Sequence, residues 1–453
     1  MLSATLLGLI PLAPLLFYAA LRNPGRFSPI YVLLVLIFVG TSLKYWLGVG
    51  LRITLEEHSL LLNDDVAVLA GFLMMTVAAL AFLVGYAVEP RAPPGASRLF
   101  QGDMARAFSH LYVPFVVLCV GLLLAFLQQM GIFDDLAAGN LQVRRLAFTE
   151  EGERTSFTFL AVGAKWLQVL FLARIAYRQR ITPVSLALIV FALFAQFITS
   201  DRTSILIFAL MFMIVGHFSG LFQKVSARLF RTVTIAIIVL TIVVSSSLRV
   251  GIGELSRADF MTNAVAGVEE TGRQYSERPY MAGPEKLGLI REATDGRTPF
   301  LYGESMIAIV FAPIPRVLWA DKPSVRVGQF VGKEVYLRAN LSGVPPSLVG
   351  ELYLNFWWPG IIVGFYLVGR LARRFYARAA TTPAANLANA LFTAYILIVA
   401  FLADLNGGLI QLLLAGIVLV VARARFESRP LASGAAAWPS RPVAMEALNR
   451  GGA

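Results

Sequence analysis

Long apolar stretches recur along the whole chain, and most of them are separated only by short polar segments. A helix needs about 20 mostly apolar residues to cross the hydrocarbon core of a bilayer, and about eleven stretches approach that length. They are Leu6–Leu21, Ile30–Val49, Val66–Val88, Leu111–Met130, Phe157–Ala176, Pro183–Thr199, Ile205–Leu221, Val233–Leu248, Leu348–Leu371, Leu387–Ala403 and Leu409–Ala422. Hydrophobic residues make up 57% of the chain and charged residues only 15%, which favours a polytopic membrane protein over a water-soluble globular one. The sequence therefore predicts an all-α polytopic membrane protein with about 11 transmembrane helices.

The connections between these stretches form two alternating sets that differ in charge. One set is short and basic, and basic residues in short loops stay on the cytoplasmic side of a membrane. Its basic residues are Arg22, Arg26, Arg91, Arg98, Arg106, Arg174, Arg178, Arg180, Lys224, Arg228, Arg231, Arg370, Arg373, Arg374, Arg378, Arg423, Arg425 and Arg429. Only four of the 27 acidic residues fall on the same side, namely Glu89, Asp103, Glu427 and Glu446. We therefore expect the N-terminus outside and the C-terminus inside.

The expected spans divide the chain into four regions. Residues 1–248 hold the first eight spans, with an outer loop at 131–156. Residues 249–347 form a large outer loop, which is the only place with room for a small globular elaboration. Residues 348–422 hold the last three spans. The tail at 423–453 is rich in Ala, Pro, Gly and Ser and is predicted to be a disordered cytoplasmic segment.

One part of the large loop is apolar enough to enter the bilayer. Residues 302–318 are short for a span, and Pro313 and Pro315 interrupt them. A full crossing would place the basic segment that follows the ninth span on the outside, against the charge rule. We therefore expect a re-entrant or interfacial helix, which is tolerated where protein or a water-filled cavity surrounds it.

Basic residues from separate parts of the chain fall at the expected outer boundary. They are Arg144, Arg145, Arg202, Arg249, Arg316, Lys322 and Arg326. Charge at membrane depth is costly and is usually functional, and the planar guanidinium group fits phosphate oxygens through two hydrogen bonds. Taken singly, each arginine is also explained as an interfacial anchor or as the partner of a nearby acid. Asp201 is such an acid for Arg202. Together they predict a site for a lipid-linked phosphate or pyrophosphate.

Carboxylates and aromatic residues lie near the same boundary. Glu351 and Asp404 are candidate catalytic bases, because a carboxylate at the outer rim can take a proton from a hydroxyl group; each could equally cap a helix or pair with an arginine. Helical spacing places Asn355 one turn below Glu351 on the same face, with Tyr353 to one side. Tyr353, Asn355 and the interfacial Trp319 are candidate residues for positioning a substrate.

Several chemistries lack their sequence signatures. The chain contains no phosphate-binding loop, nucleophile elbow or dinucleotide-binding fingerprint,. None of its three histidines has a ligand neighbour at metal-binding spacing,. Its single cysteine, Cys119, excludes a disulfide within the chain,. We therefore expect no cofactor and no metal. We also expect no nucleic-acid partner, because the net charge of +12 suits loops that face anionic membrane lipids.

Two stretches resemble a known family. The run "PIPRVLWADKP" (residues 313–323) and the later run "PPSLVGELYLNFWWPG" (residues 345–360) resemble the Wzy-type polymerases of O-antigen and exopolysaccharide repeat units. The run "SDRTSIL" (residues 200–206), the number of spans and the large outer loop before the last spans are similar to that family as well.

The resemblance implies a glycosyltransferase of the bacterial inner membrane that acts on its periplasmic face. The donor is a growing glycan on polyprenyl pyrophosphate, and the acceptor is a single lipid-linked repeat unit. The resemblance reaches Arg202, Arg316, Lys322 and Glu351, whereas Arg249, Arg144, Arg145 and Asp404 rest on position alone. A chain-length regulator and a flippase are further partners that it suggests.

Three other classes stay open at this stage, one of which is a structural membrane scaffold whose large outer loop only binds partners. An O-antigen ligase, which transfers a finished glycan to a lipid core, also combines many spans with a large outer loop and an arginine cluster. A lipid-linked oligosaccharide flippase or other transporter would predict internal repeats and broken or charged helices near the midplane. No such repeat is detected in the sequence.

Overall fold

The computed structural model describes residues 9–22, 24, 27–38, 65–88, 110–137, 161–198, 202–224, 283–296, 298–311, 319, 327–337, 344–396 and 405–427. Every regular element in these ranges is a helix, and they contain no strand. The elements are α2 (Ala13–Arg22), α3 (Pro29–Ile37), α6 (Asp65–Ala87), α8 (Tyr112–Gln129), α9 (Ile132–Ala137), α10 (Val162–Arg178), α11 (Pro183–Ile198), α12 (Arg202–Phe218), η3 (Leu221–Lys224), α15 (Pro284–Gly296), α16 (Glu304–Phe311), α17 (Val327–Phe330), η4 (Val331–Val335), α18 (Ser347–Arg378), α19 (Pro383–Leu391), η5 (Phe392–Ile396) and α21 (Leu405–Glu427).

The helices follow the apolar stretches of the sequence. Among the described residues, three helices are long and apolar enough to cross a membrane: Val66–Ala87, Tyr112–Gln129 and Ser347–Arg378. Local start signals agree with the helix starts. The Thr382 side chain accepts a hydrogen bond from the Ala385 N–H, and Pro383 occupies the first turn of α19, as is usual where a hydroxyl side chain caps a helix. The chain is an all-α protein with helices suited to a membrane.

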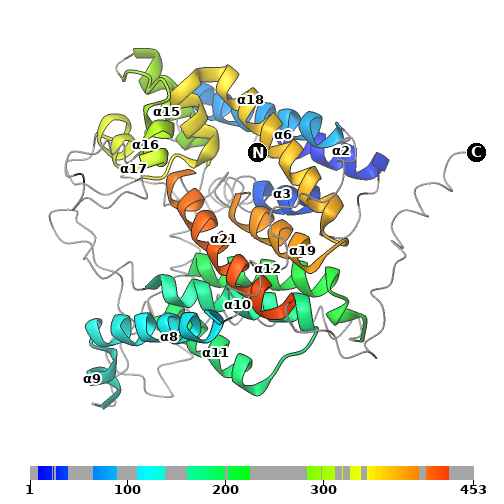
Figure 1. Ribbon diagram of the computed structural model, residues 1–453. Coiled ribbons are helices and arrows are strands. Elements are labelled where there is room, and N and C mark those ends of the chain that lie inside the picture. The colour runs from blue at the N-terminus through cyan, green and yellow to red at the C-terminus, as the bar shows by residue number, and fades with distance from the viewer. Residues whose placement is uncertain are drawn as a thin grey trace, which may run out of the picture.

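The described helices form two groups, each around its own hydrophobic core. In Figure 1, α2, α3, α6, α15 and α18 lie in the upper part, and α8, α10, α11 and α12 lie in the lower part. Helix α19 packs against both α12 and α18, and α21 packs against α10. Leu210 of α12 contacts both cores. The two groups therefore meet along α12, α18 and α19.

Glycines bring α6 into close contact with its neighbours. A Cβ atom at Gly85 would overlap the carbonyl oxygen of Tyr366, and one at Gly369 would overlap that of Phe82. Toward the other end of α6, a Cβ atom at Gly71 would overlap the carbonyl oxygen of Pro284 in α15. Small residues let membrane helices approach backbone to backbone, which maximises van der Waals contact where the hydrophobic effect contributes little.

One end of the molecule gathers basic and aromatic side chains. The Arg373 guanidinium lies 5.4 Å from the centroid of the Tyr86 ring, and an Arg178 Nη2–H donates to the Phe426 carbonyl oxygen at 3.2 Å. The Phe218 ring packs edge-on against Tyr376, which joins the two groups of helices here. We call this the basic end. It contains the C-terminal ends of α6, α10, α12 and α21, and α15 lies at the opposite end.

Helix α18 is not one continuous rod. Its backbone is non-helical at Phe356 and Trp357, ahead of Pro359. A Cβ atom at Gly364 would overlap the Leu352 side chain, although residues twelve apart in a straight helix are separated by about 18 Å. The first segment of α18 therefore folds back along the second (Figure 1). The expected continuous span at 348–371 is thus interrupted, because proline and a residue with positive φ cannot continue a helix.

We expect Gly85→Ala to destabilise the packing of α6 against α18. The added methyl group meets a backbone oxygen, which cannot move away by changing rotamer, so the cost should be roughly 1–3 kcal/mol. Thermal unfolding in detergent measures it. Gly121→Ala is the matched control, because a Cβ atom there meets no described atom within 4 Å. Equal melting temperatures for the two variants would contradict the close contact.

Candidate functional site

Two separate stretches of the sequence meet at the break in α18. The Leu301 N–H donates to the Leu354 carbonyl oxygen at 2.8 Å, and the Gly303 N–H donates to Asn355 Oδ1 at 3.0 Å. The last carbonyl groups of a helix have no partner within it, and the turn before α16 supplies donors here. The end of the first segment of α18 is therefore completed by residues about 50 positions earlier in the chain.

Three buried side chains extend this junction. Asn355 Nδ2 donates to Ser305 Oγ at 2.7 Å and to the Glu351 carbonyl oxygen at 2.7 Å. Ser305 Oγ in turn donates to Glu351 Oε1 at 3.1 Å. We call Ser305, Glu351 and Asn355 the polar lock. As the helical spacing predicted, Glu351 and Asn355 share one face of α18, and they face α16.

The polar lock is closed to solvent. Glu351 is 0% exposed and Asn355 is 1% exposed. A carboxylate needs hydrogen-bond donors when it is buried, and the Ser305 hydroxyl supplies one. Because a general base must reach the proton that it removes, this enclosure favours a positioning role for Glu351 over direct proton transfer.

The backbone around the polar lock is strained. Tyr302 has φ +44° and Trp357 has φ +56°, and such conformations cost bulky side chains about 1–3 kcal/mol each. Gly303 has φ +90°, and a Cβ atom there would lie 3.1 Å from the Phe356 ring. Only glycine meets both conditions without further cost. Strain of this kind tends to collect at functional sites.

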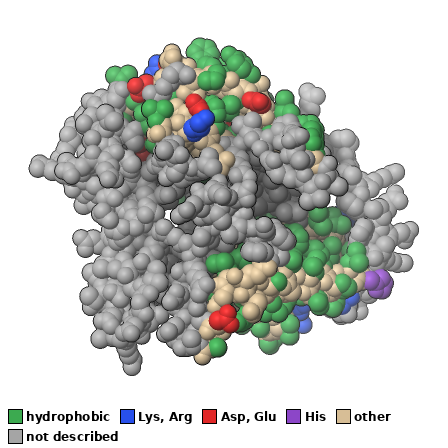
Figure 2. Space-filling model, turned by 90° about the vertical axis from the view of Figure 1, so that its left-hand side faces the viewer, with side chains coloured by type: hydrophobic (Ala, Val, Ile, Leu, Met, Phe, Trp, Pro, Cys, Tyr) green, Lys and Arg blue, Asp and Glu red, His purple; other side chains and the backbone are tan. Residues whose placement is uncertain are grey.

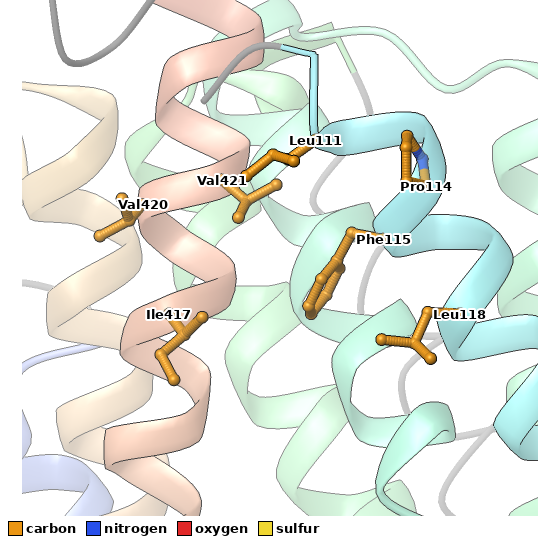
Figure 3. A pocket seen from close by; sticks show the side chains of 7 residues that line it. All are labelled: Leu111, Pro114, Phe115, Leu118, Ile417, Val420 and Val421. Atoms are coloured by element: carbon orange, nitrogen blue, oxygen red, sulfur yellow. The ribbon is translucent and has the colours of Figure 1, made fainter. Parts of the chain in front are cut away.

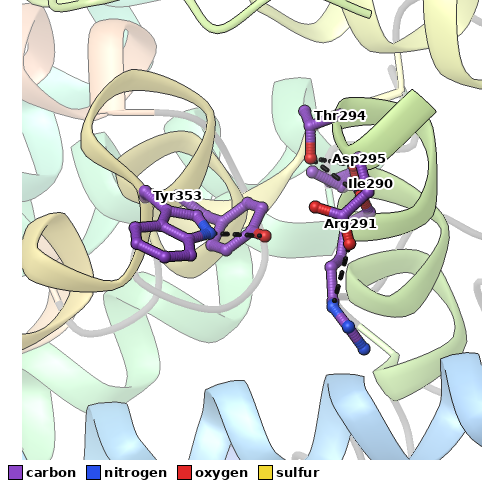
Figure 4. Close-up of polar contacts among 6 residues, drawn as sticks. Ile290, Arg291, Thr294, Asp295 and Tyr353 are labelled. Carbon is purple, nitrogen blue, oxygen red and sulfur yellow. Dashed lines mark hydrogen bonds and ion pairs between the residues drawn. The ribbon is translucent and has the colours of Figure 1, made fainter. Parts of the chain in front are cut away.

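The strained residues expose aromatic rings. Tyr302 is 80% exposed and Trp357 is 51% exposed. The Trp357 indole N–H donates to the Tyr353 hydroxyl at 3.1 Å (Figure 4), and Phe300 packs against both Tyr302 and Tyr353. We call Phe300, Tyr302, Tyr353 and Trp357 the aromatic platform. Tyr353 is fully buried and Phe300 is partly buried, so these two rings support the exposed Tyr302 and Trp357 rings. An exposed aromatic ring of this kind can stack on the apolar face of a sugar ring.

Helix α15 closes the other side of the junction. Lys286 is 0% exposed, and its Nζ donates to the Pro345 carbonyl oxygen at 2.8 Å, which anchors the start of α18. On the outer face of α15, Arg291 pairs with Asp295 at 3.4 Å. Figure 2 shows charged side chains gathered over this end of the molecule. No spacing in the sequence marked Lys286 as buried.

Many of the residues predicted for the site lie outside the described part of the chain. They are Arg144, Arg145, Arg249, Arg316, Lys322, Arg326 and Asp404. Arg202 is the first residue of α12, and its side chain lies outside the description. Trp319 is 36% exposed and packs edge-on against Phe311, the last residue of α16. The described residues contain no cluster of three or more His, Cys, Asp or Glu side chains that could hold a metal ion.

Sequence reasoning missed a second group of buried polar side chains. Asn386, Asn389 and Thr393 lie along one face of α19 and η5, and each is 0% exposed. Asn386 Nδ2 donates to the Val215 carbonyl oxygen at 3.1 Å. Within the described part of the chain, the Asn389 amide and the Thr393 hydroxyl have no hydrogen-bond partner. Their spacing of three and four residues was the signal that could have revealed them.

Comparison with known proteins adds no further constraint. The chain matches no protein-family model, no curated protein and no solved structure.

We expect Asn355→Ala to loosen the junction between α16 and α18. The change leaves the Gly303 N–H without its acceptor, and a buried polar group without a partner costs about 1–3 kcal/mol. Hydrogen exchange at Gly303 should accelerate, and thermal stability should fall. Thr381→Ala, which removes an exposed hydrogen bond to Arg378, should change stability by less than about 0.5 kcal/mol. Unchanged exchange at Gly303 would argue against the lock.

Proposed function

We propose that this protein polymerises polyprenyl-pyrophosphate-linked oligosaccharide repeat units on the periplasmic face of a bacterial inner membrane. One observation carries the proposal. The run at 345–360, which resembles the repeat-unit polymerases, folds back at the end opposite the basic end and joins α16 through the polar lock. The aromatic platform lies beside that junction, with the Tyr302 and Trp357 rings exposed, so the same end offers both a rigid frame and a surface for sugars.

The proposed topology has eleven spans, with the N-terminus periplasmic and the C-terminus cytoplasmic. It is supported by the grouping of basic helix ends. Arg178, Arg373 and Arg425 belong to three different helices, and all lie at the basic end. Because arginine-rich ends stay in the cytoplasm, the polar lock and the aromatic platform would then face the periplasm.

The chain connectivity supports a pyrophosphate site near the polar lock. Arg202 is the first residue of α12, and the last residue of that helix, Phe218, lies at the basic end. Arg202 therefore lies toward the opposite side of the molecule, where the polar lock is. Arg316 follows the end of α16 by five residues, and Asp404 directly precedes α21, which packs against α16. We propose that Arg202, Arg249 and Arg316 bind the pyrophosphate, with Lys322, Arg326, Arg144 and Arg145 contributing positive charge.

The reaction is a displacement at an anomeric carbon. The terminal hydroxyl oxygen of the acceptor repeat unit attacks the carbon that is bonded to pyrophosphate. The new glycosidic bond forms as the bond to pyrophosphate breaks, and polyprenyl pyrophosphate leaves. Preorganised guanidinium groups stabilise the negative charge that develops on the leaving group. A rim carboxylate, for which Asp404 is the candidate, takes the proton of the acceptor hydroxyl.

The described residues have supporting roles in this scheme. The Ser305, Glu351 and Asn355 side chains hold α16 at a fixed distance from α18, and Tyr302 and Trp357 stack on the acceptor sugars. Such positioning accelerates a reaction because it removes motions that would otherwise have to be frozen in the transition state.

Reconstitution with purified lipid-linked repeat units tests the proposal. A ladder of products that differ by one repeat unit supports a polymerase. Transfer of glycan to a lipid core, or movement of intact lipid-linked units across the membrane without elongation, would replace it with a ligase or a flippase.

We expect Arg316→Ala and Arg249→Ala each to abolish the ladder while the protein still accumulates in the membrane. Lysine at either position should rescue activity poorly, because an ammonium group cannot make the two parallel hydrogen bonds of a guanidinium. Arg370→Ala, which changes an exposed arginine near the basic end, is the matched control and should leave the ladder intact. Normal ladders from both Arg316→Ala and Arg249→Ala would remove the pyrophosphate clamp.

A further inference from the structure

An apolar groove runs between α8 and α21 on the surface of the protein. Its volume is about 450 Å³, and Figure 3 shows side chains of both helices lining it. The lining residues are Leu111, Pro114, Phe115, Leu118, Ile417, Val420 and Val421. No polar side chain is among them, so water has nothing to bind in this groove.

The groove opens toward the region that lipid would occupy. Only 22% of the Tyr112–Gln129 helix is buried, and Leu118 and Ile417 are 50% and 55% exposed. The lining from Leu111 to Leu118 extends about 10 Å along the helix axis. Because half of a bilayer's hydrocarbon core is about 15 Å thick, the groove has the length for part of one acyl chain in a single leaflet.

Positive charge stands at one end of the groove. Arg425 follows Val421 by one helical turn, and its guanidinium lies 6.0 Å from the centroid of the Tyr112 ring. Arg178 lies at the same place, bound to the Phe426 carbonyl oxygen, and the Phe426 ring packs edge-on against Tyr112. The groove therefore ends at the basic end of the molecule.

We propose that this groove binds an anionic phospholipid, with one acyl chain between α8 and α21 and the headgroup phosphate beside Arg425. Guanidinium groups form strong, charge-assisted hydrogen bonds with phosphate oxygens, and basic pockets between helices are known sites for anionic headgroups. The site is separate from the polar lock, which lies at the opposite end, and it does not depend on the proposed polymerase activity.

The position of the positive charge indicates which kind of lipid the groove binds. A lipid-linked glycan that reacts near the polar lock would carry its diphosphate at the other end of the protein. Arg425 and Arg178 place positive charge at the end of the groove that lies at the basic end, so the groove matches a lipid of the leaflet at that end.

Lipid retention by the purified full-length protein tests the proposal. The protein is placed in an equal mixture of phosphatidylglycerol and phosphatidylcholine, and the lipids that stay bound are counted by native mass spectrometry. The wild type should retain phosphatidylglycerol in preference to phosphatidylcholine. Arg425→Gln should reduce that preference about fivefold, since one basic residue near a membrane surface contributes about 1 kcal/mol. Leu118→Trp should reduce retention of phosphatidylglycerol by filling the groove.

Matched variants separate this site from the general lipid surface. Arg370→Gln removes an exposed arginine of α18, and Ile362→Trp enlarges a side chain that is 50% exposed on the same helix. Neither should change the lipid preference. Equal retention of both lipids by the wild type would overturn the proposal. So would equal losses in Arg425→Gln and Arg370→Gln, or a stronger preference for polyprenyl phosphate than for phosphatidylglycerol.

Discussion

The rest of the candidate site depends on how the broken end of α18 is satisfied. The junction is buried away from water, so each of its backbone polar groups must find a partner within the protein. The turn before α16 provides these partners, through Leu301 to the Leu354 carbonyl oxygen and through Gly303 to Asn355. Two segments that are about 50 residues apart are thereby fixed to each other, with Tyr302 held beside the break in α18.

The same constraint explains why buried polar residues and strained backbone occur together. The Ser305 hydroxyl donates a hydrogen bond to the buried Glu351 carboxylate. The conformational free energy that Tyr302 and Trp357 cost at positive φ is offset by close packing elsewhere in the protein. That packing is strongest where Gly85 and Gly369 let α6 and α18 touch backbone to backbone. The rigid junction at the polar lock and the tightly packed pair of helices are therefore two parts of one arrangement.

Part of this structure could be predicted from the sequence. The apolar stretches predicted the positions of α6, α8 and α18, because a hydrophobic helix satisfies its own backbone whatever surrounds it. Helical spacing placed Glu351 and Asn355 on one face, which the hydrogen bonds of both side chains with Ser305 confirm. Lys286 and the Asn389 amide were missed, because burial of a single polar side chain depends on neighbours that are distant in sequence.

The sequence by itself determined the helical class, since it depends on residues that are close together in the chain. Only the tertiary structure decided that α18 folds back at Trp357 and that the Glu351 carboxylate is closed off from solvent. These features require α16 and α15 to lie against α18, and long-range packing of this kind leaves no periodic pattern in a single sequence. The local sequence determines which segments become helices, whereas contacts between distant segments determine where the candidate site forms.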